Sequence, residues 1–293
     1  MTQRVAIVSR DPAVRLAAAR AFDGAPPSWS VELHDRAPAG ADAIVVGADV
    51  DEPGGVRFDP TAPGRVVDDV ARTLGRRGLV VVVTATTGGA GATTVALHLA
   101  AHAAAEHETC VVDLAGGVAE RLGLDPGDTR RWDAAAPDGI RLAATPLHTG
   151  FRGVLAEHDA DPERADALLD AAASEFPAVV VDAPRDGRLA AALGRASAAI
   201  LVTPPTLVGA RRAATVLEGA ERPPWALVVN RLGPGGETTI AELERVVGRR
   251  VALEIPCCAG VRDAEDDLRL VTSAWTRYGR ATARLWRAVG AAR

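Results

Sequence analysis

The sequence predicts an α/β protein whose larger part is a doubly wound, mostly parallel sheet, preceded by a small α/β domain. From residue 79 onward, apolar runs of strand length alternate with segments typical of helices. Most of these runs are continuously apolar, as in parallel strands covered by helices on both faces. A glycine-rich segment follows the first run, at the strand end where such sheets bind ligands.

The first part of the chain predicts a short α/β domain. Asp11 is expected to be the N-cap of its first helix, and Pro12 the first helical residue. The predicted strands are residues 4–9, 29–35 and 42–48, the predicted helices are 11–22 and 66–77, and residues 49–64 are a predicted loop. We expect the domains to be residues 1–76 and 77–293.

The larger domain follows a strand–helix alternation. Its predicted strands are residues 79–85, 109–114, 140–145, 178–184, 198–205, 225–230 and 251–256. Its predicted helices are residues 92–107, 162–175, 187–195, 207–218 and 237–247.

The segment TTGGAGATT, residues 86–94, predicts a phosphate-binding loop. Its glycines permit a tight turn whose N–H groups face an anion, and the following helix presents its N-terminus there. Thr93 is placed to offer its hydroxyl to Mg²⁺. The expected contacts to ATP or ADP are Gly88, Gly89, Ala90, Gly91, Ala92, Thr93 and Thr94. The alternative is a glycine-rich turn that binds nothing.

This loop resembles the deviant P-loop of the MinD/ParA family, whose pattern is G-K-G-G-V-G-K-T-T. Both family lysines are replaced here, by Thr87 and Ala92. The form GGAGATT is most similar to the CpaE/TadZ branch, which includes septum-site-determining-like proteins with a degenerate receiver-like domain before the MinD-like domain. The resemblance covers residues 79–293 well and 1–75 loosely.

The resemblance implies roles for residues at other strand ends. Asp113 matches the first acid of the family's D-x-D, a catalytic position, and Ala115 replaces the second acid. Asp182 would hold Mg²⁺ together with Thr93, while the side chain of Asn230 and the backbone at Pro256 would contact the base. The alternative is that these aspartates cap turns and that Asn230 is an ordinary loop residue.

The substitutions predict weak catalysis. Removing one charged contact to an oxyanion typically costs about 2–4 kcal/mol. Three charged residues of the family are replaced here, by Thr87, Ala92 and Ala115. All 33 basic residues are arginines, so no lysine elsewhere can compensate. Arg185 is the nearest candidate substitute by sequence.

Residues 5–15 resemble the first strand and helix of a receiver domain. A working receiver needs acidic residues after its first strand and a phosphoacceptor aspartate after its third. Here these places hold Ser9, Arg10 and Asp11, and then Gly47. We therefore expect no phosphorylation and a role in dimerisation or partner docking. The alternative is an extra layer that only packs on the main domain.

The last stretch, residues 271–293, predicts a basic amphipathic helix. Its apolar face comprises Val271, Trp275, Tyr278, Leu285 and Val289. Docking onto the sheet is favoured over contact with a membrane, because one apolar stripe is typical of a packed surface helix.

Metal binding is not expected. His98 and His102 have the i, i+4 spacing of metal ligands, but no third ligand accompanies them. Cys110, Cys257 and Cys258 fit neither a metal site nor a disulfide framework, as in a reducing cytosol.

Charge and composition bound the location and partners. The net charge of −5 argues against DNA binding. No signal pattern or apolar run of membrane-spanning length is present, so a cytoplasmic protein is expected, peripheral to the inner face of the membrane at a pole or septum.

The resemblance implies a non-catalytic or weakly catalytic localisation and scaffold protein. It would act as a homodimer in Tad/Flp pilus or secretion assembly, docking the assembly ATPase, or at the septum with polar or septal proteins. One alternative is an active ParA/MinD-type ATPase switch on membrane or DNA. Another is a metabolic P-loop enzyme, which the missing lysine also disfavours.

Overall fold

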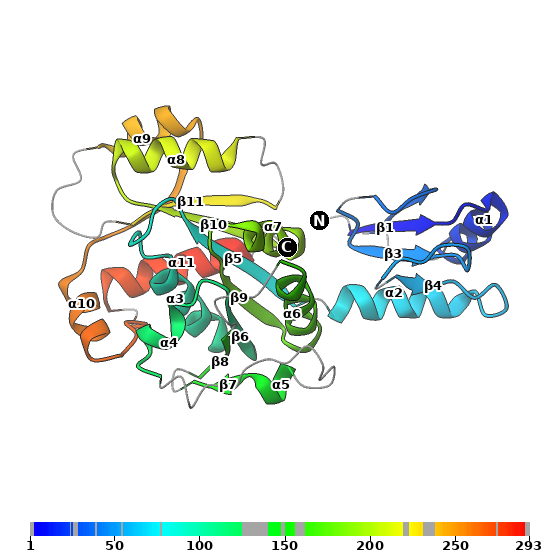
Figure 1. The fold of residues 1–293 in the computed structure, drawn as a ribbon, viewed down its shortest axis with the longest axis horizontal. Helices are drawn as coiled ribbons and strands as arrows, with labels where there is room; N and C mark the ends of the chain where they lie inside the picture. The colour runs from blue at the N-terminus through cyan, green and yellow to red at the C-terminus, as the bar shows by residue number, and fades with distance from the viewer. Residues whose placement is uncertain are drawn as a thin grey trace. The chain divides into compact units, whose positions relative to one another are not determined.

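The computed structural model divides into two compact units, residues 1–77 and 78–293 (Figure 1). The structure describes all residues except 1–2, 24, 26–28, 39, 54, 77, 125–139, 148–149, 156–161, 219–222, 231–237, 274 and 291–293.

The first unit is a four-stranded parallel sheet in the order β2-β1-β3-β4. Its elements are β1 (Gln3–Val8), α1 (Pro12–Ala21), β2 (Trp29–His34), β3 (Ala43–Val46), β4 (Val56–Arg57) and α2 (Gly64–Arg76). The Asp11 carboxylate accepts from the Ala13 N–H, which confirms the predicted cap. The stretch predicted as a loop contains β4, a two-residue strand that forms only because it pairs with β3.

A carboxylate that the sequence interpretation missed lies at the end of β3. Ser9 Oγ donates to Asp49 Oδ1 at 2.7 Å, and Arg10 N donates to Asp49 Oδ2 at 2.6 Å. The Ser9 hydrogen bond is the main cause of the lowered pKa of Asp49. A Cβ on Gly47 would lie 2.5 Å from Asp49 Oδ1, so this closure requires glycine. Asp49 therefore joins two strand ends.

The second unit contains an eight-stranded sheet in the order β12-β11-β10-β5-β9-β6-β8-β7. Its strands are β5 (Leu79–Ala85), β6 (Thr109–Asp113), β7 (Thr145–Pro146), β8 (Arg152–Leu155), β9 (Ala178–Asp182), β10 (Ala198–Thr203), β11 (Trp225–Asn230) and β12 (Val251–Ile255). Neighbouring strands are parallel, apart from the antiparallel β7–β8 pair. β5, which leads into the glycine-rich loop, lies in the interior of the sheet.

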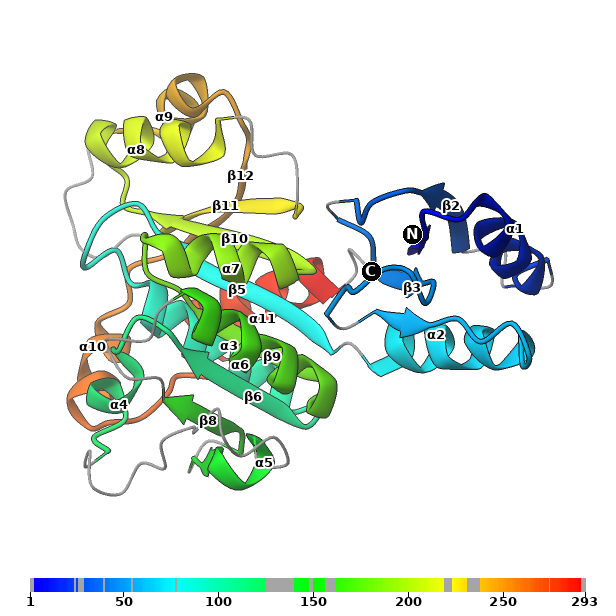
Figure 2. The same cartoon turned by 45° about the vertical axis from the view of Figure 1, so that its right-hand side comes forward.

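Helices cover both faces of this sheet (Figure 2). The helices of this unit are α3 (Ala92–Ala104), α4 (Val118–Arg121), α5 (Ile140–Ala143), α6 (Pro162–Glu175), α7 (Gly187–Arg195), α8 (Leu207–Leu217), α9 (Ile240–Val247), α10 (Ala259–Asp266) and α11 (Arg277–Gly290), of which α3, α6, α7, α8 and α11 contact its strands. Val81 and Val83 of β5 face the core shared with α3 and α11, whereas Val80 and Val82 face α6 and α7. Leu201 of β10 packs with α8 and α9 on the latter side. The continuously apolar strands are thus buried on both faces, as predicted.

One predicted strand is wrong. Residues 140–143 form α5, and Thr145 begins β7. The stretch Ile-Arg-Leu-Ala contains good helix formers, and Ile140 is buried in the α6 side of the core. The strand beyond β6 is instead β8, Arg152–Leu155, which the sequence analysis did not predict.

The C-terminal helix starts later than predicted, at Arg277. Val271 and Trp275 precede it, and Trp275 is 93% exposed. Tyr278, Leu285 and Val289 are buried in the core that α11 shares with α3. These three residues of the predicted apolar face are therefore docked within the domain, as predicted. Within the described residues, no helix is both long and apolar enough to cross a membrane.

Candidate functional site

The glycine-rich loop, residues 86–94, leaves the end of β5 and enters the first turn of α3. Gly89 and Gly91 have φ values of +74° and +91°, a region that L-residues rarely adopt. A Cβ on Gly88 or Gly89 would meet nothing within 4 Å, so the backbone there borders open space. The loop therefore has room beside it for a ligand.

Thr93 and Asp182 meet at the foot of this loop. The Thr93 hydroxyl donates to Asp182 Oδ2 at 2.6 Å, joining the first turn of α3 to the end of β9. Burial raises the pKa of Asp182 to about 7, and the nearby Asp113 adds to the increase. A hydroxyl and a carboxylate are oxygen donors of the kind that Mg²⁺ prefers.

Asp113 caps the turn after β6. Its carboxylate accepts from the N–H groups of Ala115, Gly116 and Val118 at 3.1, 2.6 and 2.9 Å. Burial raises the pKa of Asp113 despite these bonds. The turn-capping alternative thus describes the contacts of Asp113. Its catalytic role stays a prediction, and Ala115 supplies no second carboxylate.

The structure brings Asn230 and Pro256 to the same cavity as the loop. This cavity has a volume of about 110 Å³. The Asn230 side chain is buried, and its Nδ2 donates to the Ala90 carbonyl at 2.9 Å, which fixes the loop against the end of β11. Gly89, Gly91 and Thr94 form the loop side of the cavity.

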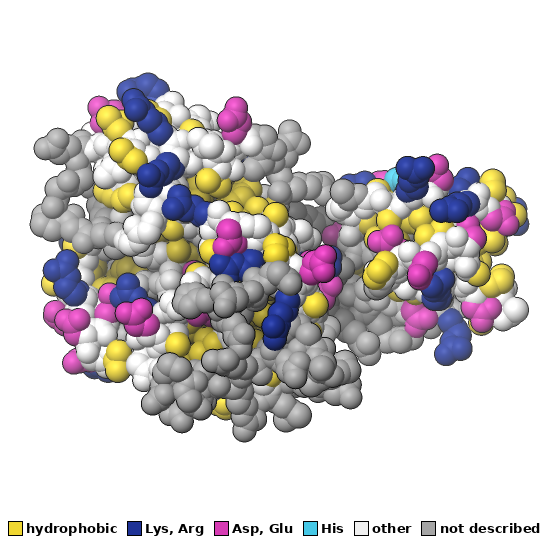
Figure 3. Space-filling view, viewed as in Figure 1, with side chains coloured by type: hydrophobic (Ala, Val, Ile, Leu, Met, Phe, Trp, Pro, Cys, Tyr) yellow, Lys and Arg dark blue, Asp and Glu magenta, His cyan; other side chains and the backbone are white. Residues whose placement is uncertain are grey.

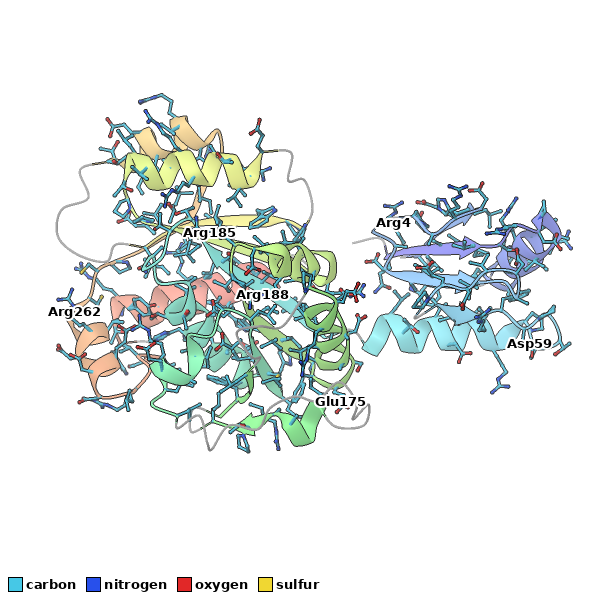
Figure 4. All side chains as sticks on the ribbon, viewed as in Figure 1. Arg4, Asp59, Glu175, Arg185, Arg188 and Arg262 are labelled. Carbon is cyan, nitrogen blue, oxygen red and sulfur yellow. The ribbon has the colours of Figure 1, made fainter. Side chains whose placement is uncertain are left out.

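Arginines approach the loop from two sides. Arg185 Nη1 donates to the carbonyl of Thr86, the first residue of the loop (Figure 4). Arg262 lies on α10 and lines the cavity. Neither replaces a lysine at position 92 in the chain, but both bring positive charge near the loop.

Sequence reasoning missed a chain of contacts from α3 to α10 and α4. Thr94 Oγ1 donates to Glu265 Oε1 at 2.7 Å, and Arg121 Nη1 lies 2.8 Å from Glu265 Oε2. Tyr278 of α11 also lines the cavity. In the sequence, the acidic residues after Pro256 were the only indication of this contact. Which of them faces the loop depends on where α10 begins and how it packs.

The two histidines of α3 hold helices together. His98 Nε2 accepts from the Val271 N–H, so Nδ1 carries the proton and donates to the Thr94 carbonyl. Burial lowers the pKa of His98 to about 4. His102 contacts the Thr282 hydroxyl of α11 at 2.9 Å. In the described part of the chain, no group of three His, Cys, Asp or Glu side chains suits a metal ion.

Three features of these residues fit an adenine nucleotide with Mg²⁺. Thr93 and Asp182 offer oxygen ligands, the glycines leave the loop backbone accessible, and Asn230 and Pro256 border the adjoining cavity. The misfit is charge, because positions 87 and 92 carry no cation.

No family model matches the chain. Two curated relatives, the uncharacterized proteins Rv3660c and MT3760 of Mycobacterium tuberculosis, are each 34% identical to it over 208 residues. The match covers 66% of this chain and 57% of each relative, so the chain spans little more than half of their length.

Solved structures resemble the larger unit. A ParA family ATPase from Chlorobium tepidum superimposes with a TM-score of 0.62 and 20% identity, covering 72% of this chain and 98% of that one. The cell division ATPase MinD of Pyrococcus furiosus gives 0.62 and 19%, covering 73% and 99%. MinD of Pyrococcus horikoshii, solved with Mg-ADP, gives 0.60 and 19%, covering 72% and 95%. The chain thus has the fold of the MinD/ParA P-loop ATPases, which confirms the predicted α/β class.

Proposed function

We propose that this protein is a MinD/ParA-type protein that binds an adenine nucleotide with Mg²⁺ at residues 86–94 but hydrolyses it poorly or not at all. One observation carries the proposal. The loop keeps its left-handed glycines and its Thr93–Asp182 contact, while Thr87 and Ala92 provide no charge. Backbone N–H groups suffice to attract phosphates, but charge neutralisation is what accelerates phosphoryl transfer.

Each part of the site would have a separate task. The backbone from Gly88 to Thr94 would contact the phosphates, Asn230 and Pro256 would lie at the base, and Thr93 with Asp182 would hold the metal ion. Bound Mg²⁺ would neutralise phosphate charge. Arg185, held at the Thr86 carbonyl, is the cation best placed to assist.

The cellular role that we propose is localisation or scaffolding as a homodimer. Solved structures with this fold include a MinC:MinD cell division complex, McdA and a plasmid partition protein. From the resemblance of the loop to the CpaE/TadZ branch, the partner that we propose is a protein of a Tad/Flp pilus or secretion apparatus, or of the septum. The small unit would serve in dimerisation or partner docking, and its strand order 2-1-3-4 is the first part of the receiver-type order 2-1-3-4-5.

Membrane and DNA contacts have less support. The apolar face of α11 is buried, so it is not available to a membrane. Arginines and acidic residues are interspersed over the visible surface in Figure 3, and the net charge is −5. DNA partners usually require a concentrated basic surface.

Calorimetric titration with ATP and Mg²⁺, with oligomeric state and phosphate release measured in parallel, tests this proposal. We expect binding without appreciable turnover, lost in Thr93→Val, which removes the hydroxyl but keeps the side-chain shape. Thr215→Val, an exposed position on α8, is the control. Absence of binding to the wild type would refute nucleotide binding.

The alternative function is an active ATPase switch. It is favoured by the intact pair of buried acids, Asp113 and Asp182, which are register partners on adjacent strands. Sustained phosphate release, abolished by Asp182→Asn and weakened by Arg185→Ala, would establish this alternative and overturn the weakly catalytic assignment.

A further inference from the structure

The cavity beside the glycine-rich loop contains a buried hydroxyl with nothing to bind. Tyr278 lines this cavity, is 3% exposed, and its hydroxyl has no hydrogen-bond partner within the described part of the chain. Buried polar groups are nearly always paired, and an exception requires an explanation. Burial and the charge of Glu265 raise the pKa of Tyr278, so its hydroxyl keeps its proton and can both donate and accept.

A carboxylate lies in the same cavity wall. Glu265 accepts from Thr94 Oγ1 through one oxygen and contacts Arg121 through the other. These contacts fix its position, and each oxygen can still accept a further hydrogen bond. Ala92 provides no positive charge at the first turn of α3, where the P-loop pattern places phosphate, and the charge of Arg121, which also lines the cavity, is paired with Glu265. Added phosphates therefore gain less here than in a loop with lysine.

Hydroxyl donors suit this wall better than phosphates do. A carboxylate and a neutral phenol form hydrogen bonds with sugar hydroxyls, whose O–H groups donate to the carboxylate and exchange bonds with the phenol. The cavity, at about 110 Å³, has room for one ring-sized group next to Gly89 and Gly91.

We propose that Glu265 and Tyr278 recognise the ribose hydroxyls of the nucleotide, so that affinity depends on the sugar more than on the number of phosphates. The preferred ligand class is a ribonucleoside mono- or diphosphate. This inference rests on the proposed nucleotide binding at the same loop and adds its selectivity.

The test is calorimetry on the full chain with Mg²⁺ and four probes, namely ATP, ADP, AMP and 2′,3′-dideoxy-ADP. The expected dissociation constants of ADP and AMP lie within about threefold of each other, and that of dideoxy-ADP is expected to be about tenfold higher than that of ADP. Tyr278→Phe removes only the hydroxyl, and Glu265→Gln removes only the charge. Each lowers the ratio between ADP and dideoxy-ADP to about twofold.

Asp266→Asn is the matched control for Glu265→Gln, since it makes the same change at an exposed position on α10. It retains the wild-type ratio. If Glu265→Gln fails to fold, Tyr278→Phe decides alone, since it preserves the ring that packs against His98.

Equal affinities for ADP and dideoxy-ADP, or a tenfold gain with each phosphate, would overturn the inference while leaving nucleotide binding intact. Failure of every probe to bind would refute the proposed nucleotide function itself, and the sugar selectivity with it.

Discussion

Position 92 is where the chemistry of this loop departs most from a working P-loop. Ala92 begins α3, next to the residue whose hydroxyl meets Asp182. The sequence led us to expect Thr93 and Asp182 as metal ligands, Thr93 from the P-loop pattern and Asp182 from the family resemblance, and the structure places the two side chains in contact. The sequence could not identify Glu265 or Tyr278, since their approach to the loop depends on the packing of α10 and α11.

Restoring the lysine should strengthen binding. Ala92→Lys is expected to tighten ATP binding by about tenfold, because an ammonium beside the phosphates adds a charge-assisted contact. Ala92→Met, similar in length but uncharged, is the control, and calorimetry is the measurement. Equal affinities in the two variants would mean that the phosphates do not reach this turn.

His98 makes stability depend on pH. In the unfolded chain a histidine titrates near pH 6.5, whereas burial lowers the pKa of His98 to about 4 in the folded protein. Between these values only the unfolded chain binds the proton, so the free energy of unfolding falls as the pH decreases from about 6.5 to 4, by about 3 kcal/mol in total. Above pH 6.5 this contribution is constant.

His98→Gln should remove this one-proton slope from unfolding curves measured in urea between pH 4 and 7, and His107→Gln, on an exposed side chain, should keep it. An unchanged slope in His98→Gln would assign the pH dependence to other groups.

Helices and strands could be predicted where the pattern of their own residues determines their type. Long apolar runs such as β5 and β10 are strands in any arrangement that buries both faces. The strands β4, β7 and β8 were not predicted, because they form by pairing with a neighbour rather than from an apolar run of their own, whereas β3, equally short, lies in such a run. The late start of α11 was also hidden, since the Val271 N–H bonds to His98 rather than within a helix.

Replacing each of two tryptophans by alanine should change the free energy of unfolding by very different amounts. Trp286 is 3% exposed and packs in the α3–α11 core, whereas Trp275 is 93% exposed. Trp286→Ala should lower the free energy of unfolding by about 3–5 kcal/mol, and Trp275→Ala should change it by less than about 0.5 kcal/mol. Urea denaturation followed by circular dichroism measures both. A small effect of Trp286→Ala would contradict the docking of α11.

At the scale of the whole molecule, each unit has its own apolar core. The strand–helix alternation predicted the α/β class of both units. It did not predict strand order, because crossover connections decide which strands become neighbours, and β5 pairs with β9 and β10 rather than with β6.

Because each unit has its own core, we expect the two units to unfold in separate transitions. A methyl group at Gly47 would collide with Asp49 and Ser9, so Gly47→Ala should destabilise the first unit by about 1–3 kcal/mol. Gly64→Ala, where the added methyl meets nothing within 4 Å, should be neutral or slightly stabilising. Calorimetric scans should show Gly47→Ala moving one transition and Trp286→Ala another. A single transition moved by both would indicate one cooperative unit.

The fixing of α3 along its length has a mechanical consequence. Glu265 contacts its first turn, Val271 bonds to His98 at its middle, and Thr282 meets His102 near its end. Because these contacts lie at the start, middle and end of α3, the helix can neither tilt nor slide without breaking several of them at once. Ligand binding therefore has few ways to move this helix. Any shape change must arise in the segments around it, and α3 serves as the fixed frame against which they move.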